Sequence, residues 1–155
     1  MKLMQDTEDK LTQWCADNLP PIVPLEKYNP PFEQLKEERN NGQCFVFNGG
    51  ADFKNTLFST HAMRYVYRAW HDSLHIASGN AFEYSNEMAV ARLQQSEAIK
   101  LGINSRDAYL LRLDLELHIK HYYQHGKHPE YQTDMIAAYL NGEDDVADFS
   151  ITSKH

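Results

Sequence analysis

Residues 105–125 carry ionisable side chains within a leucine-rich helical face, and this pattern restricts the fold more than any other feature of the chain. The ionisable residues share one arc of about 60° on a helical wheel, with leucines on both sides: Asp114, His118, His121 and His125. Arg112, Glu116 and Lys120 lie opposite and account for a solvent-exposed face. Because an unpartnered buried charge is unfavourable, the inward residues need each other, a metal ion or a substrate.

A second polar arc is predicted on a helix from about 59 to 77, beside an apolar stripe formed by Met63, Tyr67, Trp70 and Leu74. The arc spans about 100° and holds His61, Arg64, Arg68, His71, Asp72 and His75. Solvated helix faces are normally rich in Lys and Glu, which are absent from this arc. We therefore expect this face to be at least partly buried.

The other elements are predicted from caps and breakers. Helices are expected at 7–18 with Asp6 or Thr7 as the cap, from Asn29 to about Arg39, and from Asn80 to Gly102 with Glu83 completing a capping-box-like pair. A last short helix should precede Gly142. The sequence "CFVF" at 44–47 reads as a short strand, whereas the prolines at 19–31 predict irregular backbone.

These elements predict an all-α, single-domain helical bundle with three long core helices, short terminal helices and minimal strand content. The domain should span 1–155, with a proline-containing N-terminal wrap at 1–50, a three-helix metal-site core at 59–125 and an acidic tail at 142–155. A chain of 155 residues can bury a hydrophobic core as one domain.

Charge and hydropathy narrow the possible partners. The net charge is −7, which gives no general attraction to nucleic acids or anionic membranes. No stretch approaches the roughly 18 apolar residues of a membrane span, and the first residues lack a signal-peptide apolar region. We expect a cytoplasmic protein without a membrane partner.

The three helices together predict a metal site. His71 and His75 lie one helical turn apart, and Glu87 follows on the next helix as a third candidate ligand. Glu83 lies one turn before Glu87, and a role as helix cap explains it better than a role as ligand. Asp114, His118 and His121 would face them from the third helix. Imidazole and carboxylate ligands suit a divalent Zn, Mn or Fe ion.

The run "HDSLH" at 71–75 can be interpreted in two ways. It resembles the H-E-x-x-H of zincin peptidases, which implies that His71, His75 and Glu87 bind zinc and that Asp72 is the base. It also resembles the "HDxxH" of HD-superfamily phosphohydrolases, which implies Asp72 as a ligand and Asp114 as the distant aspartate. That superfamily has a further upstream His, and the only earlier one here is His61.

The longer run "YRAWHDSLHIASGNAFEYSNEMAVAR" resembles a family of short bacteriophage proteins that share an aromatic-Arg-x-x-His-Asp motif, a nearby second His and a Glu-containing helix. The resemblance covers about residues 64–95. It implies a phage origin and the cytoplasm of an infected bacterium, and it implies no chemistry of its own.

The combined pattern predicts a metal-dependent hydrolase acting on a phosphate ester of a nucleotide or nucleic acid. Asp72 would be catalytic and Arg64 and Arg68 would orient the phosphate of a small-molecule or nucleotide substrate. Three alternatives remain open: a zincin-like metallopeptidase, a di-iron oxygenase, and a small acidic phage protein that binds and inhibits a host protein and whose His cluster is structural.

Overall fold

The computed structural model describes residues 1–26, 29–47 and 55–142. Its elements, in chain order, are α1 (Gln5–Asn18), β1 (Ile22–Leu25), α2 (Phe32–Asn40), β2 (Cys44–Phe47), α3 (His61–Ser78), α4 (Tyr84–Lys100), α5 (Ser105–His125) and α6 (Gln132–Leu140). The all-α class is confirmed, since the described strands form a single two-stranded sheet. The predicted acidic tail lies outside the described residues apart from its first position.

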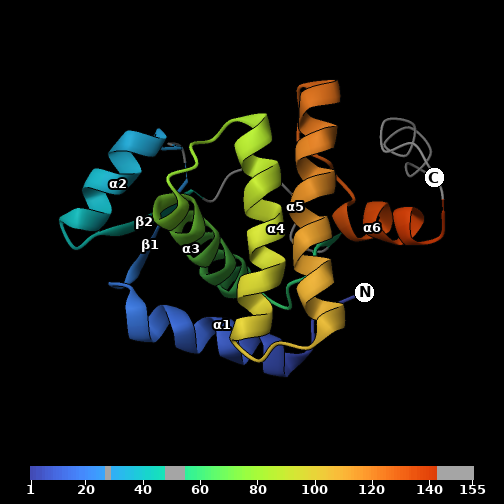
Figure 1. The fold of residues 1–155 in the computed structure, drawn as a ribbon, viewed down its shortest axis with the longest axis horizontal. Coiled ribbons are helices and arrows are strands. Elements are labelled where there is room, and N and C mark those ends of the chain that lie inside the picture. The colour runs from blue at the N-terminus through green and yellow to red at the C-terminus, as the bar shows by residue number, and fades with distance from the viewer. Residues whose placement is uncertain (27–28, 48–54, 143–155) are drawn as a thin grey trace.

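The helices α4 and α5 run side by side, and α3 crosses them at an angle (Figure 1). The helix α1 packs along one end of α3, and α6 lies against α5 (Figure 1). The helix α3 ends at Gly79 and α5 at Gly126, both with positive φ, as expected for C-terminal caps. Within the described ranges, no helix combines the length and apolar character that crossing a membrane requires.

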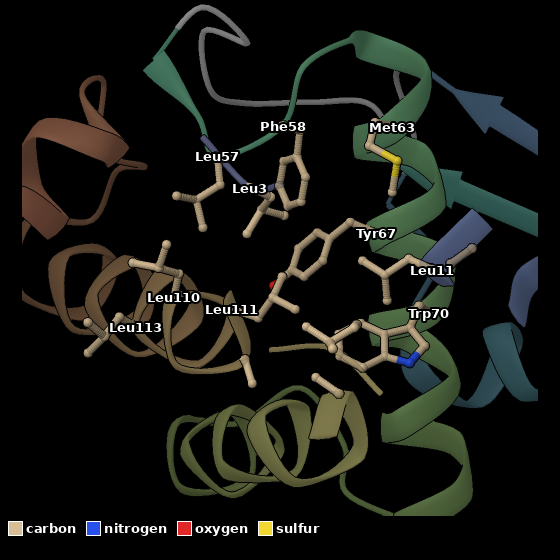
Figure 2. Packing of buried hydrophobic residues seen from close by; sticks show 14 of the residues in the cluster. Leu3, Leu11, Leu57, Phe58, Met63, Tyr67, Trp70, Leu110, Leu111 and Leu113 are labelled. Carbon is tan, nitrogen blue, oxygen red and sulfur yellow. The ribbon is translucent and has the colours of Figure 1, made fainter. Parts of the chain in front are cut away.

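The main core lies between α1, α3 and α5 and includes the loop before α3. Figure 2 shows its large side chains meeting from these segments, with Trp70 and Tyr67 from α3 opposite Leu111 from α5. Trp70 and Leu111 are almost fully buried. A smaller cluster of Val90, Ala91, Leu115 and Ile119 joins α4 to α5. The two clusters fix the rotation of α3, α4 and α5, and so decide which polar residues face inward.

The strand β1 corrects the prediction of irregular backbone at 19–31. Ile22–Leu25 pairs in parallel with β2, with Pro24 opposite Val46. Proline is tolerated because β1 has a single neighbouring strand, so an amide hydrogen is not required on its open side. Nearby, Asn29 does not cap α2: the cap position is Pro31, whose backbone is extended, and it makes no side-chain cap bond.

Two further predicted caps are wrong. The helix α4 begins at Tyr84, with the exposed Glu83 at the cap position, where its side chain makes no capping hydrogen bond. Asn80 belongs instead to the end of α3, because its N–H donates to the His75 carbonyl. The helix α1 starts after Met4 without a side-chain cap from Asp6 or Thr7. Its first turn is held by a residue 100 positions further along the chain.

Asp107, in the first turn of α5, supplies this long-range cap. Its Oδ2 accepts bonds from the Met4 N–H (2.9 Å) and the Thr7 hydroxyl (2.5 Å), and its other oxygen contacts Arg106. Burial alone would raise the pKa of Asp107, but the bonds from Thr7 and Met4 outweigh it and the pKa is lowered. The ionised carboxylate therefore stabilises the folded state.

We expect Asp107→Asn to lower the free energy of unfolding by about 2 kcal/mol, the range for hydrogen bonds to a charged group. Because the folded pKa lies below the unfolded one, this stabilisation is present above the unfolded pKa, near pH 4, and is lost as pH falls through the folded pKa. Urea unfolding at pH 7 and at pH 3 measures both effects. Asp6→Asn, which alters an exposed pair with Lys10, is the control, and equal losses in the two variants would contradict the assignment.

Candidate metal centre

Three side chains from α3 and α4 converge next to a cavity that two of them line. One ligand atom from each of His71, His75 and Glu87 lies within 4.8 Å of the others, so the group could hold a metal ion. His71 Nε2 is 3.9 Å from Glu87 Oε1, and His75 Nε2 is in direct contact with the same oxygen. His75 and Glu87 are buried and His71 is half-buried.

Second hydrogen bonds fix how both histidines are oriented. His75 Nδ1 lies 2.6 Å from the Asn80 carbonyl oxygen, which can only accept, so Nδ1 carries a proton. His71 Nδ1 lies 2.7 Å from Gln94 Oε1. The amide of Gln94 is oriented by its Nε2, which donates to the Leu111 carbonyl (2.7 Å), so Oε1 accepts from His71. Both imidazoles therefore direct Nε2 towards Glu87.

This orientation has a direct electrostatic consequence. If His75 were neutral, the lone pair of its Nε2 would face the carboxylate of Glu87, and the two would repel each other. A proton or a metal cation must therefore lie between them. Histidine ligands in metal sites characteristically donate their other ring N–H to a carbonyl or similar acceptor, as His71 and His75 do.

Burial and charge shift the pKa of each member. Burial lowers the pKa of His71, with Glu87 opposing the effect. For His75, burial alone would lower the pKa, but the bond to Glu87 outweighs it and the pKa is raised. Burial would raise the pKa of Glu87, yet His75 and His71 bring it below its usual value. In the metal-free protein both shifts favour the charged forms of the pair, the His75 imidazolium and the Glu87 carboxylate.

Aromatic rings enclose the histidines and limit their motion. His75 contacts Phe82 with ring centroids 4.7 Å apart, and Phe32 packs against both rings. On the other side, Tyr67 stacks near His71 at 6.0 Å and donates its hydroxyl hydrogen to Gln94. Phe82 and Tyr67 also line the cavity, so aromatic rings form part of its wall next to the histidines.

A cavity of about 300 Å³ opens beside the group, with His71 and Glu87 in its wall. Asp72, Arg64 and Arg68 of α3 also line it, so the predicted catalytic residues share one space with the candidate ligands. Burial raises the pKa of Asp72, although His71 and Arg39 oppose the shift. Asp72 is not a member of the three-residue group.

The structure brings together three of the six predicted ligands and leaves the other three outside this group. Asp114 and His118 line the cavity but lie outside the group, and buried His121 packs against His125 with ring centroids 4.6 Å apart. His118 is occupied on both nitrogens: its Nδ1 accepts from Gln132 (2.7 Å) and its Nε2 donates to His128 (2.8 Å). Burial lowers the pKa of His118 to about 3.

Several residues of the site were not predicted from the sequence. Gln94 lies on the same face of α4 as Glu87, two helical turns on, and that spacing is the signal that could have identified it. The roles of Phe82 and the Asn80 carbonyl depend on the loop between α3 and α4, where no periodic pattern applies. His128 and Gln132 come from the segment after α5 and from α6.

Comparison of the chain with protein families, with curated proteins and with solved structures finds no match. Inferences about function therefore rest on the geometry of the site.

Proposed function

We propose that His71, His75 and Glu87 bind one divalent metal ion and that the protein is a metal-dependent hydrolase. The observation that carries this proposal is the convergence of both Nε2 atoms on Glu87 Oε1, with each Nδ1–H held by an acceptor behind it. Two imidazoles and a carboxylate match the protein ligands of catalytic zinc sites, and Mn or Fe accept the same donors.

Three protein ligands leave a coordination position for water, and the cavity beside His71 and Glu87 is where that position would open. A bound divalent ion lowers the pKa of such a water towards neutrality and produces a nucleophile. Asp72 lines the same cavity and would accept the water proton. Its location outside the group favours a role as base over a role as ligand.

Phosphate esters, of a nucleotide or nucleic acid, are the substrates that this cavity fits best. Arg64 lies about two turns and Arg68 about one turn before His71 on α3, and both line the cavity. One guanidinium group can donate hydrogen bonds to two phosphate oxygens at once. Together with the metal ion, the two arginines would offset the negative charge of a phosphoryl group. The cavity volume of about 300 Å³ favours a mononucleotide or a single strand end.

The test is hydrolysis of a panel of phosphate esters by chelator-treated protein before and after addition of Zn, Mn or Fe. We expect turnover that depends on metal, is lost in His75→Ala and is retained in His61→Ala, which removes an exposed histidine from the same helix. Metal-bound protein that cleaves no member of the panel would contradict the phosphoesterase assignment. Turnover that resists chelation would contradict the metal mechanism.

A zincin-like peptidase is the second candidate, and one observation favours it. The group formed by His71, His75 and Glu87 without Asp72 is the ligand set that the peptidase interpretation predicts. Asp72 is one methylene shorter than the Glu of that motif and reaches less far towards a metal-bound water. Cleavage of a peptide library with no hydrolysis of phosphate esters would establish this alternative.

Gln94→Leu is expected to weaken metal binding about 10- to 100-fold, the usual effect of removing an outer partner of a metal-bound histidine. The substitution removes the acceptor that orients His71 while leaving the proposed ligands in place. Competition with a chelating dye measures the affinity. Gln95→Leu is the matched control, because Gln95 bonds to Arg112 instead. Equal affinities of the two variants would argue against the proposed role.

A further inference from the structure

Asp114 is a buried carboxyl that the proposed metal centre does not use. It lies in the middle of α5, is 6% exposed and lines the cavity. Its Oδ1 is buried and has no hydrogen-bond partner among the residues that the structure describes. A buried acceptor left unpartnered is unfavourable, so this atom is suited to a ligand that enters the cavity.

Charged and titratable groups from three helices and a loop share the cavity with Asp114. They are Arg64, Tyr67, Arg68, His71 and Asp72 from α3, Glu87 from α4, His118, Tyr122 and Tyr123 from α5, and His128 from the loop after α5. Arg64 and Arg68 are the cations whose charge acts on Asp114. An oxyanion drawn to these two guanidinium groups would therefore meet the carboxyl of Asp114 as well.

Two arginines and an ionised carboxylate can bind the same anion only if the carboxylate and the anion share a proton. A carboxylate repels an anion unless one proton lies between the two oxygens. Inorganic phosphate keeps a hydroxyl near neutral pH. A phosphate monoester has a second pKa near 6, so it can take up the shared proton on binding, at a cost that grows as the pH rises above 6. Sulfate and phosphodiesters have no proton to share.

We propose that Asp114, with Arg64 and Arg68, makes this end of the cavity selective for phosphoryl groups that can hold a proton, and against sulfate and phosphodiesters. The inference rests on the proposed function in taking the cavity as the substrate site, and it narrows the substrate to a phosphate monoester. Selectivity here comes from a repulsive group as much as from the two attractive ones.

The protonation behaviour of Asp114 agrees with this geometry. Burial raises its pKa to about 7, while Arg64 and Arg68 act in the opposite direction. At pH 8 the carboxyl is mainly ionised and requires a proton from the ligand. At pH 6 it is mainly protonated and can donate to any oxyanion, so discrimination should weaken.

Calorimetric titration of the purified protein with inorganic phosphate and with sodium sulfate tests the proposal, because it needs neither turnover nor an identified substrate. At pH 8 we expect phosphate to bind at least about tenfold more tightly than sulfate, the scale set by one unfavourable buried contact. Asp114→Asn should reduce the ratio to within about threefold by raising sulfate affinity. Arg68→Ala should weaken both anions.

Glu116→Gln is the matched control, since it converts an acid to an amide two residues further along α5, where Glu116 pairs with Arg112. It should leave the ratio of phosphate to sulfate affinity unchanged.

Three results would overturn the inference: equal binding of both anions by the wild-type protein, binding of neither, or an unchanged affinity ratio in Asp114→Asn. If Asp114→Asn does not fold, the wild-type ratio decides alone: it should fall between pH 8 and pH 6, and a constant ratio would contradict the proposal. Selective binding by a protein that hydrolyses nothing would leave the inference standing and remove the proposed function.

Discussion

The His71→Ala, His75→Ala double variant is expected to lose both its bound metal and the effect of chelators on its stability. A metal present at 100 to 1,000 times its Kd stabilises a folded protein by about 3–4 kcal/mol. For a chain of this size that corresponds to a Tm decrease of roughly 6–16 °C when a chelator removes the metal from the wild-type protein. The variant should melt at the same temperature with and without chelator.

Thermal unfolding with and without EDTA measures this effect, and His61→Ala should behave as the wild type does. The variant also removes the fully buried His75 and leaves the Glu87 carboxylate without its partner. Breaking a buried pair in this way costs about 3–5 kcal/mol, so a lower Tm alone does not tell whether His75 and Glu87 bind a metal or form a structural ion pair. The change in Tm on adding the chelator distinguishes these two roles. A wild-type Tm that is unchanged by EDTA would favour a structural ion pair.

Asp72→Asn is expected to lower kcat by roughly 10²- to 10⁴-fold, the usual contribution of a general base, while the metal stays bound. The expectation follows from the position of Asp72, which lines the cavity beside His71 but lies outside the group of three. Asparagine has the same shape and cannot accept the proton of a metal-bound water. Metal content and the rate on a hydrolysed phosphate ester are the two measurements.

The two resemblances of "HDSLH" give opposite outcomes for this variant. If Asp72 is a ligand, as the HD-superfamily resemblance implies, Asp72→Asn should release the metal together with activity. Loss of metal would therefore contradict the proposed division between ligands and base. Retention of both metal and full activity would remove Asp72 from the mechanism.

The inward polar stripe of α5 was the most informative prediction from the sequence. Asp114 and His121 are buried, because leucines on both sides of the stripe pack against other helices. The opposite face was only partly predicted: Glu116 is buried and pairs with Arg112, where a solvent-exposed side chain was expected. Periodicity gives the direction of a side chain, but α5 is covered by both α4 and α6, and a wheel of one helix cannot show this.

The candidate metal ligands also show that a sequence pattern within one helix does not reveal how helices pack together. His71 and His75 could be paired from the sequence because their one-turn spacing is local. Glu87 could be suggested because small residues follow it along α4. Whether Asp114 and His118 reach the group formed by His71, His75 and Glu87 depends on how α5 packs against α3 and α4. That packing is set by contacts between residues far apart in the sequence. The pairing of β1 with β2 was missed for the same reason, since it joins segments 22 residues apart in register.

The most direct test of the central claim is elemental analysis of the protein purified without a histidine tag, together with the His71→Ala, His75→Ala variant. We predict about one Zn, Mn or Fe ion per chain in the wild type and a small fraction of that in the variant. Absence of metal from both, after incubation with each ion, would contradict the metal centre. His75 and Glu87 would then be an ion pair that shares a proton.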